Sequence, residues 1–297
     1  MAPKIQIPDS LKADLPQTKW GKLLAATPII MTVIATMLAG LATSEMTKAQ
    51  YDRSLAAQLQ SKAGDQWSYF QAKKLRSAVA HNSLDLLLAT IEINPAGAAI
   101  LEKETDAAAF AALTESKLPN ASPAKFDAEV QTTIDAVNAS KPETEITAGL
   151  AKISNATLAQ SLTDAHDAAD AFDNATKSLN KTVDKLDETL MNGGDKDAAK
   201  YFAAARLRYT SARYDAEARL NQSIANVYEL QVRKGNISAE RHHQRSQRFF
   251  YGMLFAQMGV IISTFAIAAR KKSFLWSLAA AAGLGALSFS AYVYLCF

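Results

Sequence analysis

The sequence predicts an all-α integral membrane protein with three transmembrane helices and a long helical domain between the first and second. Three segments carry no charged residue, namely 23–44, 249–269 and 273–297. Each has about 20 residues or slightly more, which at a rise of ~1.5 Å per residue crosses a hydrocarbon core of ~30 Å. Glycine (12) and proline (8) are scarce among 297 residues, and alanine is abundant, which favours long helices over sheets.

The order of charged and uncharged segments predicts a topology. The polar stretch 1–22 precedes transmembrane helix 1 (23–44), which is interpreted as an uncleaved signal anchor. Transmembrane helices 2 (249–269) and 3 (273–297) are joined only by the basic loop 270–272. Three crossings place this loop and the N-terminus on one side of the membrane. The positive-inside rule favours the cytoplasm for that side, which leaves the large helical domain extracytoplasmic.

Between the first and second spans, four segments are expected. An ascending helix covers 45–94 and ends before Pro95, because the residue before proline avoids the α conformation. Its recurring apolar residues are Leu55, Leu59, Trp67, Phe70 and Leu75. The alanine-rich segment 95–142 is interrupted by further prolines and predicts one or two short helices. A heptad-patterned helix covers 143–190. A descending helix covers 195–248, with Asp195 as its cap and a local stop at Gly235-Asn236.

Two heptad seams predict an antiparallel helical hairpin with a coiled-coil contact. In 143–190, apolar or small residues follow alternating steps of three and four, and the same steps continue on the descending helix. Asn192-Gly193-Gly194 supplies the turn between them. The residues expected to carry helix packing, and association with another copy or a partner, are Trp67, Phe70, Phe172, Leu179, Val183, Leu186, Phe202 and Tyr209.

Two further groups of residues have patterns that are typical of contact with lipid or of helix packing within a membrane. Arg241, Arg245 and Arg248 recur at helical spacing just before transmembrane helix 2, which suits contact with lipid headgroups or the ordinary snorkelling of long cations. In transmembrane helix 3, small residues four positions apart favour close packing between helices. These pairs are Ala279 with Gly283 and Ala282 with Ala286.

The sequence does not indicate an enzyme. We find no nucleophile motif, phosphate-binding loop or metal-ligand spacing, so we predict no catalytic residue, no metal and no cofactor. His242 and His243 are adjacent and point about 100° apart on a helix, which prevents chelation from one face. The net charge of +3 is small and dispersed and gives no argument for binding nucleic acid.

Two stretches carry a resemblance to a known family. The block from Asp65 to Lys73, DQWSYFQAK, and the run from Arg241, RHHQRSQRFFYGMLFAQMGVIISTFAIA, resemble the bacterial family called domain of unknown function 4337. The resemblance covers the two ends of the chain, about half of it, and we recognise no counterpart for 95–190. It implies an uncharacterised multi-pass protein of the bacterial inner membrane, and it implies no activity.

These observations favour a non-enzymatic, membrane-anchored scaffold or accessory subunit that forms a homo-oligomer or binds a membrane-protein partner. Two alternatives stay open. One is an oligomeric pore lined by the small-residue faces of the spans. The other is a membrane sensor that acts through a separate output protein, since only about 22 residues precede the first span.

Overall fold

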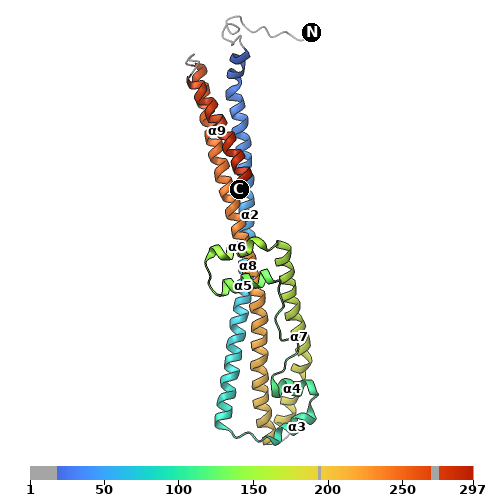
Figure 1. Cartoon of the computed structure of the whole chain (residues 1–297). Helices are drawn as coiled ribbons and strands as arrows, with labels where there is room; N and C mark the ends of the chain where they lie inside the picture. Colours follow the sequence, from blue (N-terminus) through green and yellow to red (C-terminus); the bar gives the residue numbers. More distant parts are fainter. Residues whose placement is uncertain (1–18, 193–194, 269–273, 297) are drawn as a thin grey trace, which may run out of the picture. The chain divides into compact units, whose positions relative to one another are not determined.

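The computed structural model describes residues 19–192, 195–268 and 274–296, and every regular element among them is an α-helix (Figure 1). The predicted all-helical class is therefore confirmed. Most of the N-terminal segment 1–22 and the basic loop 270–272 lie outside the described residues. The chain divides into two compact units: unit 1 comprises Met1–Ser54 and Asn236–Phe297, and unit 2 comprises Leu55–Gly235.

Two long helices contribute to both units. They are α2 (Lys19–Thr90) and α8 (Lys196–Ala268), and α9 (Phe274–Cys296) belongs to unit 1 alone. The remaining helices of unit 2 are α3 (Ala96–Glu104), α4 (Ala107–Glu115), α5 (Ala128–Asn138), α6 (Glu143–Lys152) and α7 (Asn155–Asn192).

In unit 2, α8 buries two different faces. One face packs against α7, because Phe202 and Tyr209 share a core cluster with Leu179, Val183 and Leu186. Leu101 of α3 and Leu113 of α4 close the same cluster. Large apolar side chains therefore fill the contact between α7 and α8, at the positions where the heptad pattern predicts packing.

The other face of α8 lies against α2 and is built from small residues. The Ser77 hydroxyl donates to the Ser211 carbonyl oxygen at 2.9 Å, so the two backbones approach closely at this point. Steps of seven from Ser77 and Ser211 reach Ala63 on α2 and Ala218 and Ala225 on α8, all of them buried. Apart from Phe70, which lies between Ala63 and Ser77, this seven-residue repeat consists of alanine and serine and allows α2 and α8 to pack at short range within unit 2.

The segment 95–190 is more divided than predicted. Three short helices, α3, α4 and α5, replace the expected one or two in 95–142. The predicted single helix over 143–190 is also wrong, because α6 ends at Lys152 and α7 begins at Asn155. The break has a local cause. The Ser154 hydroxyl accepts a hydrogen bond from the Thr157 backbone N–H at 2.9 Å, which is an N-cap of α7.

One prediction about the long helices is corrected. The expected stop at Gly235-Asn236 is absent, since α8 continues through both residues. Glycine inside a helix lowers helix stability by only about 1 kcal/mol relative to alanine, which is too little to end a helix of this length. Leu55 and Leu75, two of the recurring apolar residues of the ascending helix, are both exposed. The packed face follows the seven-residue repeat of Ala56, Ala63, half-buried Phe70 and Ser77.

Unit 1 packs three helices through small side chains. Ala35 of α2, Ala256 of α8 and Ala286 of α9 share one core cluster with Leu38 and Phe249. The outer surfaces of the three helices carry large apolar residues, and all of the following are exposed: Ile29, Ile30, Val33, Met37, Leu41, Phe250, Leu254, Phe255, Met258, Ile261, Phe265, Leu278, Leu284 and Leu287.

Candidate functional site

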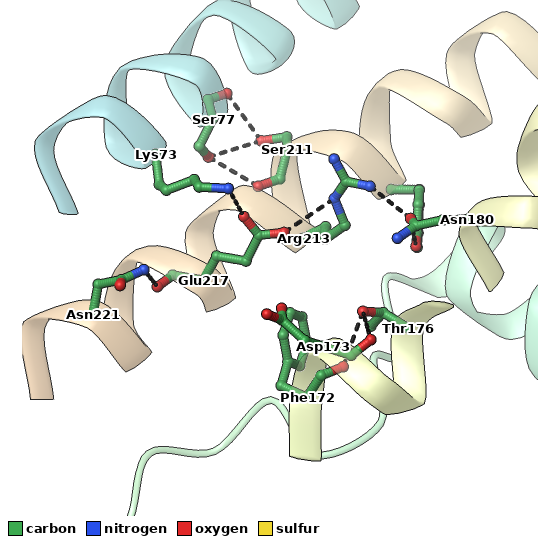
Figure 2. Close-up of polar contacts among 11 residues, drawn as sticks. Lys73, Ser77, Phe172, Asp173, Thr176, Asn180, Ser211, Arg213, Glu217 and Asn221 are labelled. Carbon is green, nitrogen blue, oxygen red and sulfur yellow. Dashed lines mark hydrogen bonds and ion pairs between the residues drawn. The ribbon is translucent and has the colours of Figure 1, made fainter. Parts of the chain in front are cut away.

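A polar network joins α2, α7 and α8 inside unit 2 (Figure 2). Glu217 of α8 is its centre. One carboxylate oxygen of Glu217 accepts a hydrogen bond from Lys73 of α2, and the other pairs with the Arg213 Nε at 3.3 Å. The Arg213 Nη1 donates to the Asn180 side-chain oxygen of α7 at 2.6 Å, and the Tyr209 hydroxyl donates to that oxygen at 2.7 Å. Five side chains on three helices thus form one connected set.

The network is largely shielded from water. The side chain of Glu217 is 13% exposed, and those of Lys73 and Arg213 are also mostly covered. Both cations lie over the ring of Tyr214, with Lys73 Nζ at 5.2 Å and Arg213 Cζ at 4.8 Å from its centroid. The electron-rich ring face therefore supports the two cations that the single carboxylate of Glu217 also neutralises.

Burial changes the acid–base properties around the network. Burial raises the pKa of Tyr209 above its ordinary value, although Arg213 opposes the change. The pKa of Asp173 on α7 is also raised, first by desolvation and then by the nearby carboxylate of Glu217. Tyr209 therefore stays protonated and serves as a hydrogen-bond donor at neutral pH.

The geometry of the network suits positioning of the helices. The two carboxylate oxygens of Glu217 are each engaged by a cation, Lys73 on one side and Arg213 on the other. Asn180 accepts from two donors on α8 and thereby fixes α7 against α8 in one register. A buried polar group of this kind is best satisfied in a single alignment of the helices, which makes register specificity its plainest physical consequence.

A second polar cluster lies in unit 1, at the end of the uncharged segment of α2. The Glu45 carboxylate lies 2.6 Å from His242 Nδ1 of α8 and 2.8 Å from Lys48 Nζ. Burial raises the pKa of Glu45, but the hydrogen bonds from Lys48 and His242 outweigh it, so the net pKa is lowered. The Ser246 hydroxyl donates to the Ala42 carbonyl oxygen at 2.7 Å one turn away. Polar contacts therefore align α2 with α8 in this unit also.

The predicted lipid-contact arginines lie on α8 within unit 1. Arg241 is exposed, whereas Arg245 and Arg248 are half-buried. The three residues therefore differ in their accessibility, which the even spacing in the sequence did not indicate.

The predicted packing residues are mostly inside the fold. Ala279, Gly283 and Ala286 are buried in unit 1 and Ala282 is half-buried. A Cβ built on Gly283 comes within 1.9 Å of Met31 Cε, so the absence of a side chain there admits the methionine of α2. In unit 2, Phe172, Leu179, Val183, Leu186, Phe202 and Tyr209 are all buried within the chain.

This burial limits the predicted role of the α7 seam. Its large side chains are covered by α3, α4 and α8 of the same chain, so the seam offers no apolar surface to a second chain. Trp67 and Phe70 are half-buried and contact each other edge to face, with ring centroids 5.5 Å apart. Any association with another chain must use a different surface of unit 2.

Sequence reasoning missed Glu217, Arg213 and Asn180 as site residues. Each looks like an ordinary polar residue of a helix surface, and Lys73 lies 144 positions from Glu217. The small residues between α2 and α8 did leave a signal. Ala35, Ala42, Ala49, Ala56 and Ala63 recur every seven residues.

Two helices are long and apolar enough to cross a membrane by length and composition, the portions Ala25–Thr90 of α2 and Lys196–Ala266 of α8. Helix α9 contains a shorter apolar stretch, Ser277–Val293. Among residues 19–192, 195–268 and 274–296, no group of three or more His, Cys, Asp or Glu side chains is arranged to hold a metal ion. The described chain is thus an all-helical protein with candidate membrane-spanning helices.

The family follows from a comparison with known families. The model of the family described as "Domain of unknown function (DUF4337)" matches residues 20–180, and the chain belongs to this family. The predicted family is therefore confirmed, but its extent differs. The match includes 95–180, where we recognised no counterpart, and it ends before the run that starts at Arg241. No curated protein and no solved structure matches the chain.

Proposed function

We propose that this protein is a multi-pass scaffold of the bacterial inner membrane, which self-associates or holds a membrane-protein partner and has no enzymatic activity of its own. Unit 1 is its membrane anchor, with three crossings, and unit 2 is its water-facing domain. The N-terminus and the loop 270–272 are cytoplasmic in this proposal, and unit 2 is extracytoplasmic.

One observation supports the membrane anchor: mainly small side chains pack inside unit 1, and many large apolar side chains are exposed on its surface. Alanine and glycine line most of the contacts among α2, α8 and α9, with a few larger residues such as Leu38 and Phe249 among them. Many leucine, isoleucine, phenylalanine and methionine side chains are exposed around these contacts. In water this surface is costly, because a continuous exposed apolar area drives aggregation. In lipid the same arrangement is favourable, since small residues allow close helix contact and acyl chains solvate the large ones.

The scaffold role rests on how unit 2 uses its polar groups. The side chains of the network around Glu217 are engaged with one another, and their evident effect is to hold α2, α7 and α8 in one alignment. A stiff helical domain on a membrane anchor presents a fixed surface to other proteins, which is what a scaffold or accessory subunit requires.

The proposal is tested in bacterial membranes carrying the full chain. We expect the protein to remain in the membrane after an alkaline carbonate wash and to be released only by detergent. An externally added protease should cut unit 2 in spheroplasts and spare it in inverted vesicles. Release by carbonate would contradict the membrane anchor. Protection of unit 2 in spheroplasts would reverse the orientation alone, and ion flux through liposomes containing the pure protein would favour a pore.

A further inference from the structure

The outer face of α2 in unit 2 differs from the rest of that unit's surface. Every large hydrophobic side chain that is exposed in the described part of Leu55–Gly235 lies on α2. The described surfaces of α3 to α7, and of α8 within this unit, contribute none. The exposed set on α2 is Leu55, Tyr69, Leu75, Val79, Leu86 and Leu88.

Three members of this set fall on one stripe. Leu75, Val79 and Leu86 are 66%, 57% and 66% exposed. Exposed Ala72, Asn82 and Ala89 complete the stripe, which proceeds in steps of three and four from position 72 to 89. This is the a/d pattern of a coiled coil over two and a half heptads. It lies on the opposite side of α2 from buried Ser77 and Leu84, so α2 carries one packed seam and one open seam.

We infer that the open seam of α2 (Ala72, Leu75, Val79, Asn82, Leu86 and Ala89) binds the same seam of a second copy in parallel orientation. This inference rests on the proposed membrane anchoring. Copies that are inserted in the membrane with the same orientation have parallel α2 helices. Asn82 then faces Asn82 of the second copy across the axis. A single asparagine in an apolar seam favours one register, since its amide is left unpaired in any other.

The charges beside the seam are compatible with this arrangement. The steps of three and four make Ala72, Val79 and Leu86 the a positions of the seam and Leu75, Asn82 and Ala89 its d positions. In a parallel pair, the residue before an a position of one helix lies near the residue after the next d position of the other helix. Gln71 then faces Arg76, and Asp85 faces Thr90. Neither contact brings two like charges together, which would be destabilising.

The size of the seam favours a membrane-tethered copy over a soluble partner. Its three large side chains, counted on both copies, offer on the order of 600 Å² of apolar surface, less than half of the ~1,600 Å² that a standard stable interface buries. Confinement of both copies to one bilayer raises their effective concentration, so a smaller interface suffices than in free solution. A second copy is therefore the occupant that this seam fits.

Disulfide cross-linking of the full chain in membranes tests the inference. Leu75→Cys and Val79→Cys are made separately after Cys296, the one native cysteine, is replaced by serine. His81→Cys is the matched control, because His81 is 64% exposed on the same helix but lies off the seam. We expect mild oxidation to link the two seam variants into dimers about ten-fold more efficiently than the control, since disulfides need Cβ atoms about 4 Å apart.

A charge placed in the seam provides the second test. Val79→Glu should lower the dimer fraction counted by single-molecule photobleaching in supported bilayers, whereas His81→Glu should leave it unchanged. The inference is overturned if the wild-type chain is monomeric in the bilayer, or if all three cysteine variants cross-link equally. Both results leave the membrane anchor intact, because the carbonate wash measures that property separately.

Discussion

Units 1 and 2 share the long helices α2 and α8, yet they differ in the side chains that they bury most completely. The largest fully buried side chains of unit 2 include Phe172, Phe202 and Tyr209. In unit 1 they are only Val293 and Ser263 among the described residues. The exposed surfaces also differ, because large apolar residues surround unit 1, whereas in the described part of unit 2 they occur only on α2.

Under the proposed membrane anchoring, this difference matches each unit to its own surroundings, lipid for unit 1 and water for unit 2. In water, burying large apolar groups is the main driving force, at roughly 25 cal/mol per Å². In lipid that force is absent between helices, so close packing of small residues and a few polar contacts must hold them together. Substitutions that reverse side-chain size should therefore affect the two units in opposite ways.

The largest expected effect comes from removing a large side chain from unit 2. Phe172 is fully buried against Ala216 and Leu220. Phe172→Ala should lower the free energy of unfolding of unit 2 by about 4 kcal/mol, because it leaves a cavity that the helices fill only in part. Thermal unfolding in mild detergent, followed by circular dichroism, measures the change. Tyr69→Ala is the exposed control, and a loss as large there would show that cavity formation is not the cause.

The reverse substitution should disrupt unit 1. Ala286 of α9 is fully buried among α2 and α8, so Ala286→Leu forces the helices apart. We expect a cost of about 3 kcal/mol, typical of overpacking. The Ala286→Leu variant should aggregate at a lower temperature than the wild-type chain when it is heated in detergent. Ala281→Leu makes the same change on an exposed face of α9 and should be tolerated. Equal tolerance of both variants would contradict the small-residue packing of unit 1.

A smaller effect is expected at the centre of the polar network. Glu217→Ala leaves Lys73 and Arg213 without their shared carboxylate in a mostly covered site, at a cost of about 2 kcal/mol. Lys73→Ala should cost less, because Glu217 then keeps Arg213 as its partner. Chemical denaturation monitored by the fluorescence of Trp67 compares the two variants. A greater loss for Lys73→Ala would show that Glu217 is not the hub of the network.

The smallest predicted effect is a pH dependence in unit 1. The pKa of Glu45 is lowered in the folded state, so its contacts stabilise unit 1 above the ordinary pKa of the carboxyl group. That stability is lost as the pH falls from the ordinary carboxyl pKa of about 4 through the lowered pKa of Glu45. Melting temperatures at pH 6 and pH 3 test this. The pH dependence should be smaller in Glu45→Gln, and an unchanged dependence would assign it to other groups.

Much of the fold could be predicted because its signals are local or periodic. The seam residues Phe172, Leu179 and Val183 follow from steps of three and four, and each is buried. The cap at Asp195 is confirmed by its bonds from the backbone N–H groups of Asp197 and Ala198, both at 3.0 Å. Such features depend only on neighbours within one or two turns, which the sequence displays directly.

The remainder depends on contacts between distant segments. Leu75 is a large apolar residue of the kind that usually packs inside a fold. Only the position of α8 shows that Leu75 faces outward. The pairing of Lys73 with Glu217 likewise needs two helices to be placed side by side. The break at Ser154 was hidden for another reason. Serine is favoured at N-caps, but Ser161 and Ser178 lie inside α7, so a serine alone does not mark where a helix begins.

The central claim, that lipid surrounds unit 1 and water surrounds unit 2, is tested most directly by spin labels in reconstituted liposomes. A label replaces exposed Met258 on α8 in one variant and exposed Lys177 on α7 in another. Power saturation should show that the label at 258 collides with oxygen, which dissolves in lipid, and not with a water-soluble nickel complex. The label at 177 should show the reverse. Nickel access at 258 equal to that at 177 would contradict the account.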